Sequence, residues 1–244
     1  MPERLSLRLR QLGPALLRAA LPAACALCGG RCAGALCAPC RAEYLGLRRP
    51  RCRQCANPLA DAAAPLCGRC LADPPAFDAT LVAADYAAPV DQLLLQLKFG
   101  ARLALAPLFA QLLRDAVLER PELALPALLC PVPLGPARLA ERGFNQALEI
   151  ARPLARALGV ALHPTLAARA RETRAQTRLA PRERAANLRL AFVVDAAVPL
   201  RGRHVGVVDD VITSGRTLDE LAATLKRCGA ARVTNLVFAR TPPH

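Results

Sequence analysis

The chain has no tryptophan, and aromatic residues make up only 3% of its 244 positions. A nucleic-acid surface built on stacked aromatic side chains is therefore poorly supported. No apolar run approaches the roughly 20 residues that a membrane helix needs. Lysine is nearly absent too, because Lys98 and Lys226 are the only two. With 54% apolar residues a real core can form, and long disorder is not expected.

Positive charge is present in excess, and nearly all of it is arginine. The formal net charge is +14 at pH 7. This excess favours anionic partners, namely phosphates, nucleotides or nucleic acid. A basic surface without a particular partner would explain the charge equally well, so the charge alone does not choose a function.

The first 20 residues are predicted to form a separate N-terminal element, with a short amphipathic helix over residues 4–20. A signal peptide fits poorly, because Arg18 interrupts the apolar stretch and Gly13-Pro14 breaks it. We therefore expect a cytoplasmic protein without a membrane span.

Eight of the eleven cysteines form four C-x-x-C pairs. Each such turn directs two thiolates toward one point, and two turns give the tetrahedral sulfur set that zinc prefers. The gaps between pairs leave room for a hairpin to return. We predict a double zinc ribbon over residues 21–75 with two structural zinc ions, whose simplest ligand sets are sequential: Cys25, Cys28, Cys37 and Cys40, then Cys52, Cys55, Cys67 and Cys70.

Other uses of these cysteines stay open. Spacing does not exclude a cross-braced pairing, and an iron–sulfur cluster is a weaker rival. A disulfide framework needs an oxidising compartment, for which the sequence carries no signal. Cys32 is a candidate spare ligand. Cys130 and Cys228 lie in apolar contexts and are expected to be core residues.

Residues 76–244 alternate strand and helix patterns, which predicts an α/β domain with a mostly parallel sheet between helices. Pro153 is expected to kink or break the helix in which it falls. The predicted strands cover 81–86, 127–134, 165–170, 190–194, 204–211 and 232–240, and the predicted helices cover 89–98, 103–119, 144–158 and 217–229.

The segment His204–Thr217 contains the parts of a phosphate site. An apolar strand ends in Asp209-Asp210, a short polar loop follows, and a helix begins at its end. Ligands of open α/β sheets bind beyond the carboxyl ends of strands, and helix N-termini bind phosphate. We expect both carboxylates to face one cleft and to bind sugar hydroxyls, or water on Mg²⁺. The candidate phosphate contacts are Thr213, Ser214, Gly215, Arg216 and Thr217.

The pattern Asp-Asp-x-x-Thr-Ser-Gly-x-Thr resembles the 5-phosphoribosyl 1-pyrophosphate (PRPP) signature of type I phosphoribosyltransferases. Three further features resemble the ComF family, which is linked to DNA uptake in natural transformation. These are the segment 130–155, the segment 171–192 and the paired zinc ribbons. The resemblance implies a type I phosphoribosyltransferase fold that binds PRPP with Mg²⁺. It also implies that Asp209 and Asp210 contact the ribose and that 213–217 holds its 5-phosphate.

The same resemblance assigns two further loops. Residues 131–138 correspond to the pyrophosphate loop, with Arg138, Arg142 and Asn145 as anion contacts. Residues 171–187 correspond to a flexible loop with Arg171, Thr173, Gln176, Arg184 and Asn187. Lys98 ends a predicted helix and is either a site residue or an ordinary helix C-terminal charge, and we favour the second interpretation.

Two functions are compatible with these features. One is a phosphoribosyltransferase that uses Asp209 and Asp210 at the reacting ribose. The other is a non-catalytic accessory protein that binds PRPP or a nucleotide, single-stranded DNA and a helicase of the uptake machinery. Loss of Cys25 or Cys52 is expected to unfold the ribbon and to spare PRPP binding.

Overall fold

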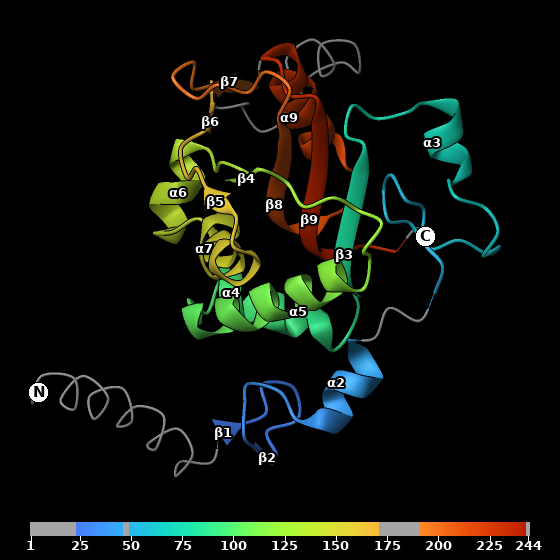
Figure 1. The fold of residues 1–244 in the computed structure, drawn as a ribbon. Helices are drawn as coiled ribbons and strands as arrows, with labels where there is room; N and C mark the ends of the chain where they lie inside the picture. The colour runs from blue at the N-terminus through green and yellow to red at the C-terminus, as the bar shows by residue number, and fades with distance from the viewer. Residues whose placement is uncertain (1–22, 46–48, 171–190, 243–244) are drawn as a thin grey trace, which may run out of the picture. The chain divides into compact units, whose positions relative to one another are not determined.

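The computed structural model describes residues 23–45, 49–170 and 191–242, and the chain forms two compact units, Met1–Gly46 and Leu47–His244 (Figure 1). The helix predicted over 4–20 lies outside the described residues. No helix in the described part of the chain is long and apolar enough to cross a membrane.

The first unit holds a short hairpin and a helix. Strand β1 (Ala23–Ala24) pairs antiparallel with β2 (Arg31–Cys32), and α2 (Ala38–Tyr44) follows. The turn between the strands closes when the Cys25 N–H donates to the Gly30 carbonyl over 2.8 Å. This hairpin brings the first C-x-x-C pair back toward the second, which lies at the start of α2.

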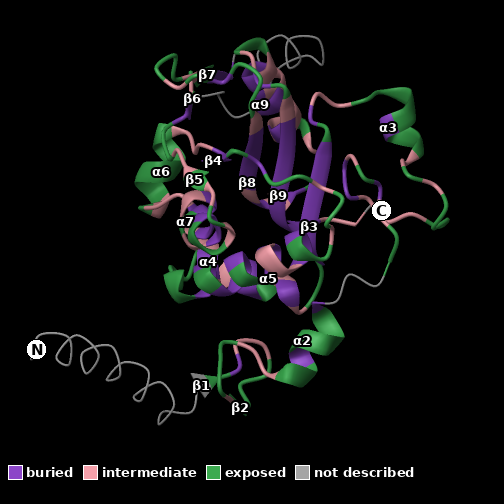
Figure 2. Cartoon of the chain, in the orientation of Figure 1, coloured by how far each residue is buried: buried purple, intermediate pink, exposed green. Residues whose placement is uncertain are grey.

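A five-stranded sheet forms the centre of the larger unit, in the order β3-β9-β8-β4-β5, and all its pairs are parallel. The parallel α/β prediction is therefore confirmed, although β5 was not predicted. The central strands are almost entirely buried (Figure 2). The strand bounds are β3 Ala79–Asp85, β4 Leu128–Pro131, β5 Ala161–Leu162, β8 His204–Ile212 and β9 Arg232–Arg240.

Three helices pack on one face of this sheet: α4 (Val90–Lys98), α5 (Ala106–Leu118, after a 3-10 turn at Leu103–Leu105) and α7 (Gln146–Leu158). The Phe109 and Phe238 rings stack with centroids 3.9 Å apart, which fixes α5 on β9. Pro153 does not break α7, because Ile150 and Leu154 are fully buried and packing holds the helix across the missing hydrogen bond.

The opposite face carries α9 (Arg216–Arg227) and residues 51–77, which we call the second ribbon and which include α3 (Gly68–Ala72). Cys52, Cys70 and Phe77 belong to the same buried cluster as Leu221 of α9. The Thr80 N–H of edge strand β3 donates to the Arg53 carbonyl over 3.1 Å. The second ribbon thus covers the sheet where a helix would otherwise do so.

A small antiparallel pair, β6 (Ala167–Arg169) with β7 (Phe192–Val194), lies beside the sheet. The Ala170 N–H donates to the Ala191 carbonyl over 3.0 Å. The residues that flank segment 171–190 are therefore held side by side. Helix α6 (Pro136–Arg142), which was not predicted, follows β4 and ends at Gly143, whose φ of 78° is left-handed.

Gly206 in β8 marks a close approach of neighbouring side chains. A Cβ there would lie 2.6 Å from Leu129 Cδ2 and 2.8 Å from Pro126 Cγ. We expect Gly206→Ala to lower the free energy of unfolding by about 1–3 kcal/mol through overpacking, measured by urea denaturation. Gly68→Ala is the matched control, because a Cβ at that position meets no atom within 4 Å. Equal stability of the two variants would contradict this packing.

Candidate functional site

The acidic pair lies at the carboxyl end of β8, inside the strand. Neighbouring strand residues point to opposite faces of a sheet. Asp210 faces the α7 side, where its Oδ1 accepts a hydrogen bond from Gln146 Nε2 over 3.2 Å and its Oδ2 pairs with Lys98. Asp209 precedes it in the strand, and its carboxyl is close enough to Asp210 for the two side chains to interact. The expectation that both carboxylates face one cleft stays a prediction.

Lys98 is the partner that makes burial of Asp210 possible. The Asp210 side chain is only 4% exposed and the Lys98 side chain 20%. A buried carboxylate needs a charged or hydrogen-bonding partner. The interpretation of Lys98 as an ordinary helix-end charge was therefore wrong, since the end of α4 brings this cation to the end of β8.

Asp209 has few groups that offset its charge. Burial, followed by the charge of Asp210, raises its pKa well above the usual aspartate value. The Asp210 N–H donates to Asp209 Oδ1 over 2.9 Å. Asp209 is also close enough to Arg169 for each to influence the other, although burial and the neighbouring charge of Arg138 lower the pKa of Arg169. This carboxyl is the one in the pair that a cationic partner would stabilise most.

The segment Arg142–Gln146 links α6, α7 and the acidic pair. Asn145 caps α7 by accepting from the Ala147 and Leu148 N–H groups, and its amide donates to the Val132 carbonyl over 3.0 Å. Arg142 donates to Gln146 Oε1 over 2.7 Å, and Gln146 in turn bonds Asp210. The predicted anion contact Arg142 is thus linked to Asp210 through Gln146.

Two further contacts hold the predicted pyrophosphate loop, residues 131–138. The Val132 N–H donates to the Val208 carbonyl over 2.9 Å, which ties the loop to β8. Arg169 Nε donates to the Pro133 carbonyl over 3.1 Å, while its guanidinium lies 5.1 Å from the centre of the Phe192 ring. Arg138 is exposed on α6, free to meet an anion.

Residues 213–215 form the turn between β8 and α9, and Arg216 and Thr217 begin the helix. Gly215 has a left-handed φ of 79° and has no side chain that could cap the helix. The Arg216 N–H makes only a long contact of 3.5 Å to Ser214 Oγ, so the start of α9 can meet an oxyanion. Thr213, Ser214 and Arg216 are exposed, and Thr217 is half-buried. Arg171, Thr173, Gln176, Arg184 and Asn187, the flexible-loop candidates, lie outside the described residues.

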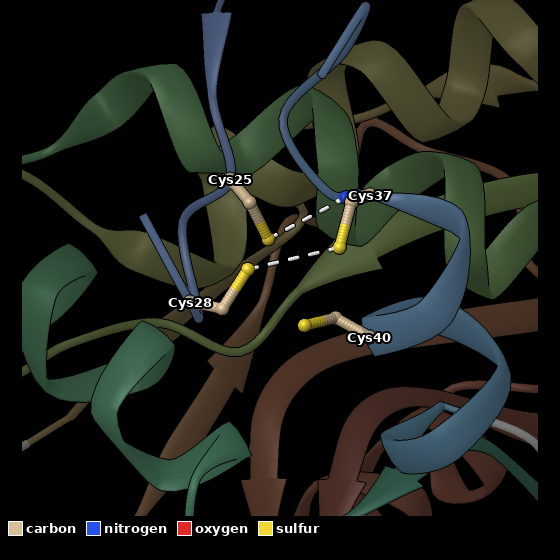
Figure 3. A group of neighbouring side chains, drawn as sticks. All are labelled: Cys25, Cys28, Cys37 and Cys40. Atoms are coloured by element: carbon tan, nitrogen blue, oxygen red, sulfur yellow. Dashed lines mark hydrogen bonds between the residues drawn. The ribbon is translucent and has the colours of Figure 1, made fainter. Parts of the chain in front are cut away.

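The eight paired cysteines gather into the two sets that sequential pairing predicts. Within each set the sulfur atoms lie within 4.8 Å of one another. Zinc–sulfur bonds of about 2.3 Å in a tetrahedron place sulfurs about 3.8 Å apart. The Cys28–Cys37 sulfurs are 3.8 Å apart (Figure 3), and the Cys55–Cys67 sulfurs 3.6 Å. Both sets fit a structural Zn²⁺ without rearrangement.

The other three cysteines lie outside these sets. Cys32 donates to the Gly34 carbonyl over 2.9 Å and is not grouped with the first set. Cys130 is fully buried, as expected. Cys228 is exposed, so its assignment to the core was wrong. It follows the last turn of α9, where that amphipathic helix leaves the sheet.

Sequence reasoning missed Arg169 and misassigned Lys98. Arg169 lies directly before segment 171–190, in a run of alternating alanine and arginine that gives no motif. The composition could have indicated a specific role for Lys98, because it is one of only two lysines in an arginine-rich chain.

Family comparisons agree with this arrangement. A family model for a double zinc ribbon domain matches residues 16–71, and one for a phosphoribosyl transferase domain matches residues 145–243. The chain therefore has a double zinc ribbon followed by a type I phosphoribosyltransferase fold.

Relatives define the family. The DNA utilization protein YhgH of Salmonella typhimurium is 39% identical over 209 residues, covering 84% of this chain and 90% of its own length. The protein of that name from Escherichia coli K12 is 39% identical, covering 78% and 84%. Competence protein F of Haemophilus influenzae is 31% identical, covering 84% and 90%. The chain belongs to the ComF family.

Solved structures give weaker likenesses. The glutamine PRPP amidotransferase of B. subtilis is 20% identical with a TM-score of 0.36, covering 55% of this chain and 25% of its own. A hypoxanthine phosphoribosyl transferase of Trypanosoma cruzi is 15% identical with a TM-score of 0.34, covering 55% and 62%. The family assignment rests on the sequence relatives.

The two lysines allow a matched test of the buried ion pair. We expect Lys98→Met to lower the free energy of unfolding by about 3 kcal/mol, because it leaves Asp210 buried and without its cation. Lys226→Met breaks the exposed pair with Asp78, whose side chains are 33% and 35% exposed, and should cost less than about 1 kcal/mol. Denaturant unfolding of both variants measures this, and similar losses would contradict the role of Lys98.

Asp209 provides a test with a defined pH dependence. Its pKa is raised on folding, so its ionisation costs stability as the pH rises above the unfolded value and through the folded one. Asp209→Asn should therefore raise Tm by about 2–4 °C, as expected for ~1 kcal/mol in a chain of this size. The gain should be larger at pH 8 than at pH 5. A gain that grows toward acid pH would contradict the assignment.

Proposed function

We propose that this protein binds PRPP together with Mg²⁺ at the carboxyl end of β8, and that it acts in the cytoplasm in DNA uptake or nucleotide metabolism. The strongest support comes from three consecutive features. Asp209 lies at the end of β8, Gly215 has a left-handed backbone, and α9 begins without a side-chain cap at its N-cap residue. The names of the relatives, DNA utilization protein and competence protein, support the biological setting.

Each part of PRPP has a matching group. The N–H groups and hydroxyls of residues 213–217 would bind the 5-phosphate at the start of α9. Carboxylates accept hydrogen bonds from sugar hydroxyls, which is the role proposed for Asp209 and Asp210. The pyrophosphate would lie at residues 131–138 with Arg138 beside it, since guanidinium groups suit phosphate oxygens.

Mg²⁺ fits Asp209 better than Asp210. The Asp210 charge is already met by Lys98 and Gln146, whereas burial and the Asp210 charge penalise ionised Asp209. Mg²⁺ prefers carboxylate oxygens and the phosphates of its ligand. When bound, it would neutralise negative charge on the pyrophosphate, and Asp209 would hold it or its water.

If the protein transfers the phosphoribosyl group, its main task is to position PRPP and the acceptor. An acceptor would attack the ribose C1 and pyrophosphate would leave with the bonding electrons. Arg138 and the residues 131–138 would hold the departing anion, and Asp209 and Asp210 would orient the ribose. The acceptor is not defined by any group in the described site.

A second candidate is a binding role without turnover, in which PRPP or a nucleotide is sensed and single-stranded DNA or a helicase is engaged. One observation favours it. Phe99 is 73% exposed, and the Arg142 guanidinium lies 5.4 Å from its ring centre. Exposed ring and arginine pairs are platforms for unpaired bases. In this candidate the segment 21–75 would be a partner surface and 76–244 the ligand domain.

Calorimetric titration with PRPP tests the proposal. We expect binding to the wild type to require Mg²⁺, and we expect Asp209→Ala to weaken it at least about 100-fold, the loss of a charged metal or ribose contact. Asp195→Ala removes an exposed carboxylate that bonds only the loop N–H of Ala197 among described contacts, and should leave affinity unchanged. Failure of the wild type to bind PRPP would disprove the proposal.

Pyrophosphate release and DNA binding separate the two candidates. Release of pyrophosphate with a nucleobase acceptor supports the transferase, and PRPP binding without turnover on any nucleobase supports the binding role. Single-stranded DNA affinity should fall steeply with salt if arginines neutralise its phosphates. Phe99→Ala should weaken that affinity about 5–100-fold, and no DNA binding at low salt would eliminate the second candidate.

A further inference from the structure

The second ribbon is joined to the end of the sheet by a buried arginine. Arg240, at the end of β9, is 3% exposed, and its guanidinium donates to Asn57 Oδ1 of the second ribbon over 2.8 Å. Arg240 is in register with Ile212 of β8, and the following Thr241 N–H donates to the Ile212 carbonyl over 3.0 Å. Ile212 is the last residue before the phosphate loop 213–217. One arginine therefore ties the second ribbon to the start of that loop.

A second connection reaches the far end of the phosphate loop. The Ala76 N–H donates to Asp219 Oδ1 over 2.6 Å, although the two residues are 143 positions apart. Gln54 of the same ribbon fixes this stretch by donating to the Pro75 and Phe77 carbonyls over 3.2 and 3.1 Å. Asp219 lies in the first turn of α9. The second ribbon thus holds the first turn of the helix whose N–H groups would meet the phosphate.

The zinc ligands themselves are adjacent to the loop. A hollow of about 40 Å³ is lined by Cys55 and Cys70 on one side and by Ser214 and Gly215 on the other. Phe77, which is 2% exposed, fills the space behind, and a Cβ placed on Gly215 would lie 3.9 Å from its Cζ. The second ribbon therefore borders one side of the loop.

The two cysteine sets lie in different units of the chain. Cys25, Cys28, Cys37 and Cys40 fall in Met1–Gly46, whereas the second set falls in the unit that holds the sheet. The expectation that loss of either Cys25 or Cys52 spares PRPP binding stays a prediction, but Cys52 is 1% exposed inside the core shared with α9, so its loss would reach the unit that holds the sheet.

We propose that the second cysteine set is a positioning element of the phosphate site, so that Zn²⁺ bound there keeps residues 213–217 in a binding-competent form. The inference rests on the proposed PRPP function and extends it. The second ribbon is short, and much of its buried surface is cysteine, so metal binding supplies most of its folding free energy. Without Zn²⁺ the ribbon would lose the geometry that holds Arg240, Ala76 and Phe77, and the loop would lose its support.

A pair of cysteine variants tests this in the full-length chain. Wild type should contain two zinc ions, and Cys25→Ser and Cys52→Ser one each, measured by atomic absorption. Titration with PRPP and Mg²⁺ should give wild-type affinity for Cys25→Ser and at least about ten-fold weaker binding for Cys52→Ser. Thermal unfolding should show a lower Tm for the larger unit only in Cys52→Ser.

A second pair keeps the zinc in place and changes only the contact. Asp219→Ala removes the acceptor for the Ala76 N–H and should weaken PRPP binding about five-fold, the value of one hydrogen bond, with two zinc ions retained. Asp219→Asn keeps an oxygen acceptor at the same position and should restore most of the affinity. This pair stays informative even if Cys52→Ser does not fold.

The outcomes separate the inference from the proposed function. Wild-type protein that does not bind PRPP overturns both. Wild-type protein that binds PRPP, with Cys52→Ser or Asp219→Ala binding equally well, overturns the inference alone. Equal weakening in Asp219→Ala and Asp219→Asn overturns it as well, because the effect would then come from the charge in α9 and not from the contact with the second ribbon.

Discussion

Burial of the Asp210 carboxylate is the constraint on which the site depends. A carboxylate that is 4% exposed must be met by a cation or by hydrogen-bond donors, and here both come from helices on one face of the sheet. Lys98 arrives at the end of α4 and Gln146 at the start of α7. Burial of this one side chain therefore brings together the ends of two helices and a strand.

This arrangement also gives the two carboxylates of the acidic pair different roles. Asp210 is compensated within the protein, so it can act as a fixed acceptor. Asp209 keeps a raised pKa because burial and its neighbour both oppose its charge. A site that leaves one carboxylate uncompensated loses stability there, and such a cost is common where a ligand or ion supplies the missing charge.

The second ribbon helps to cover the opposite face of the sheet. A parallel sheet must be covered on both sides. Helices α4, α5 and α7 cover one face, but α9 leaves part of the other to the second ribbon, whose cysteines share its buried cluster. The two halves of the double zinc ribbon therefore differ in structure. One set of four cysteines lies in a small unit of its own, and the other is part of the core of the phosphoribosyltransferase fold.

Features that are continuous in sequence could be predicted, and those that depend on distant packing could not. The β8 strand, its loop and α9 occupy one uninterrupted stretch, and each C-x-x-C pair is local, so pattern and spacing were sufficient. Gln146 meets Asp210 across 64 positions and Ala76 meets Asp219 across 143. Nothing in local spacing reports such contacts.

Hydrogen–deuterium exchange of the wild-type protein, with and without PRPP and Mg²⁺, tests the account most directly. Slower exchange on ligand addition is predicted for residues 205–219 and for the second ribbon, 51–77, with no change in residues 25–40. Protection that is absent from 205–219, or that appears in both cysteine sets alike, would contradict a phosphate site built from the end of β8 and supported by the second ribbon.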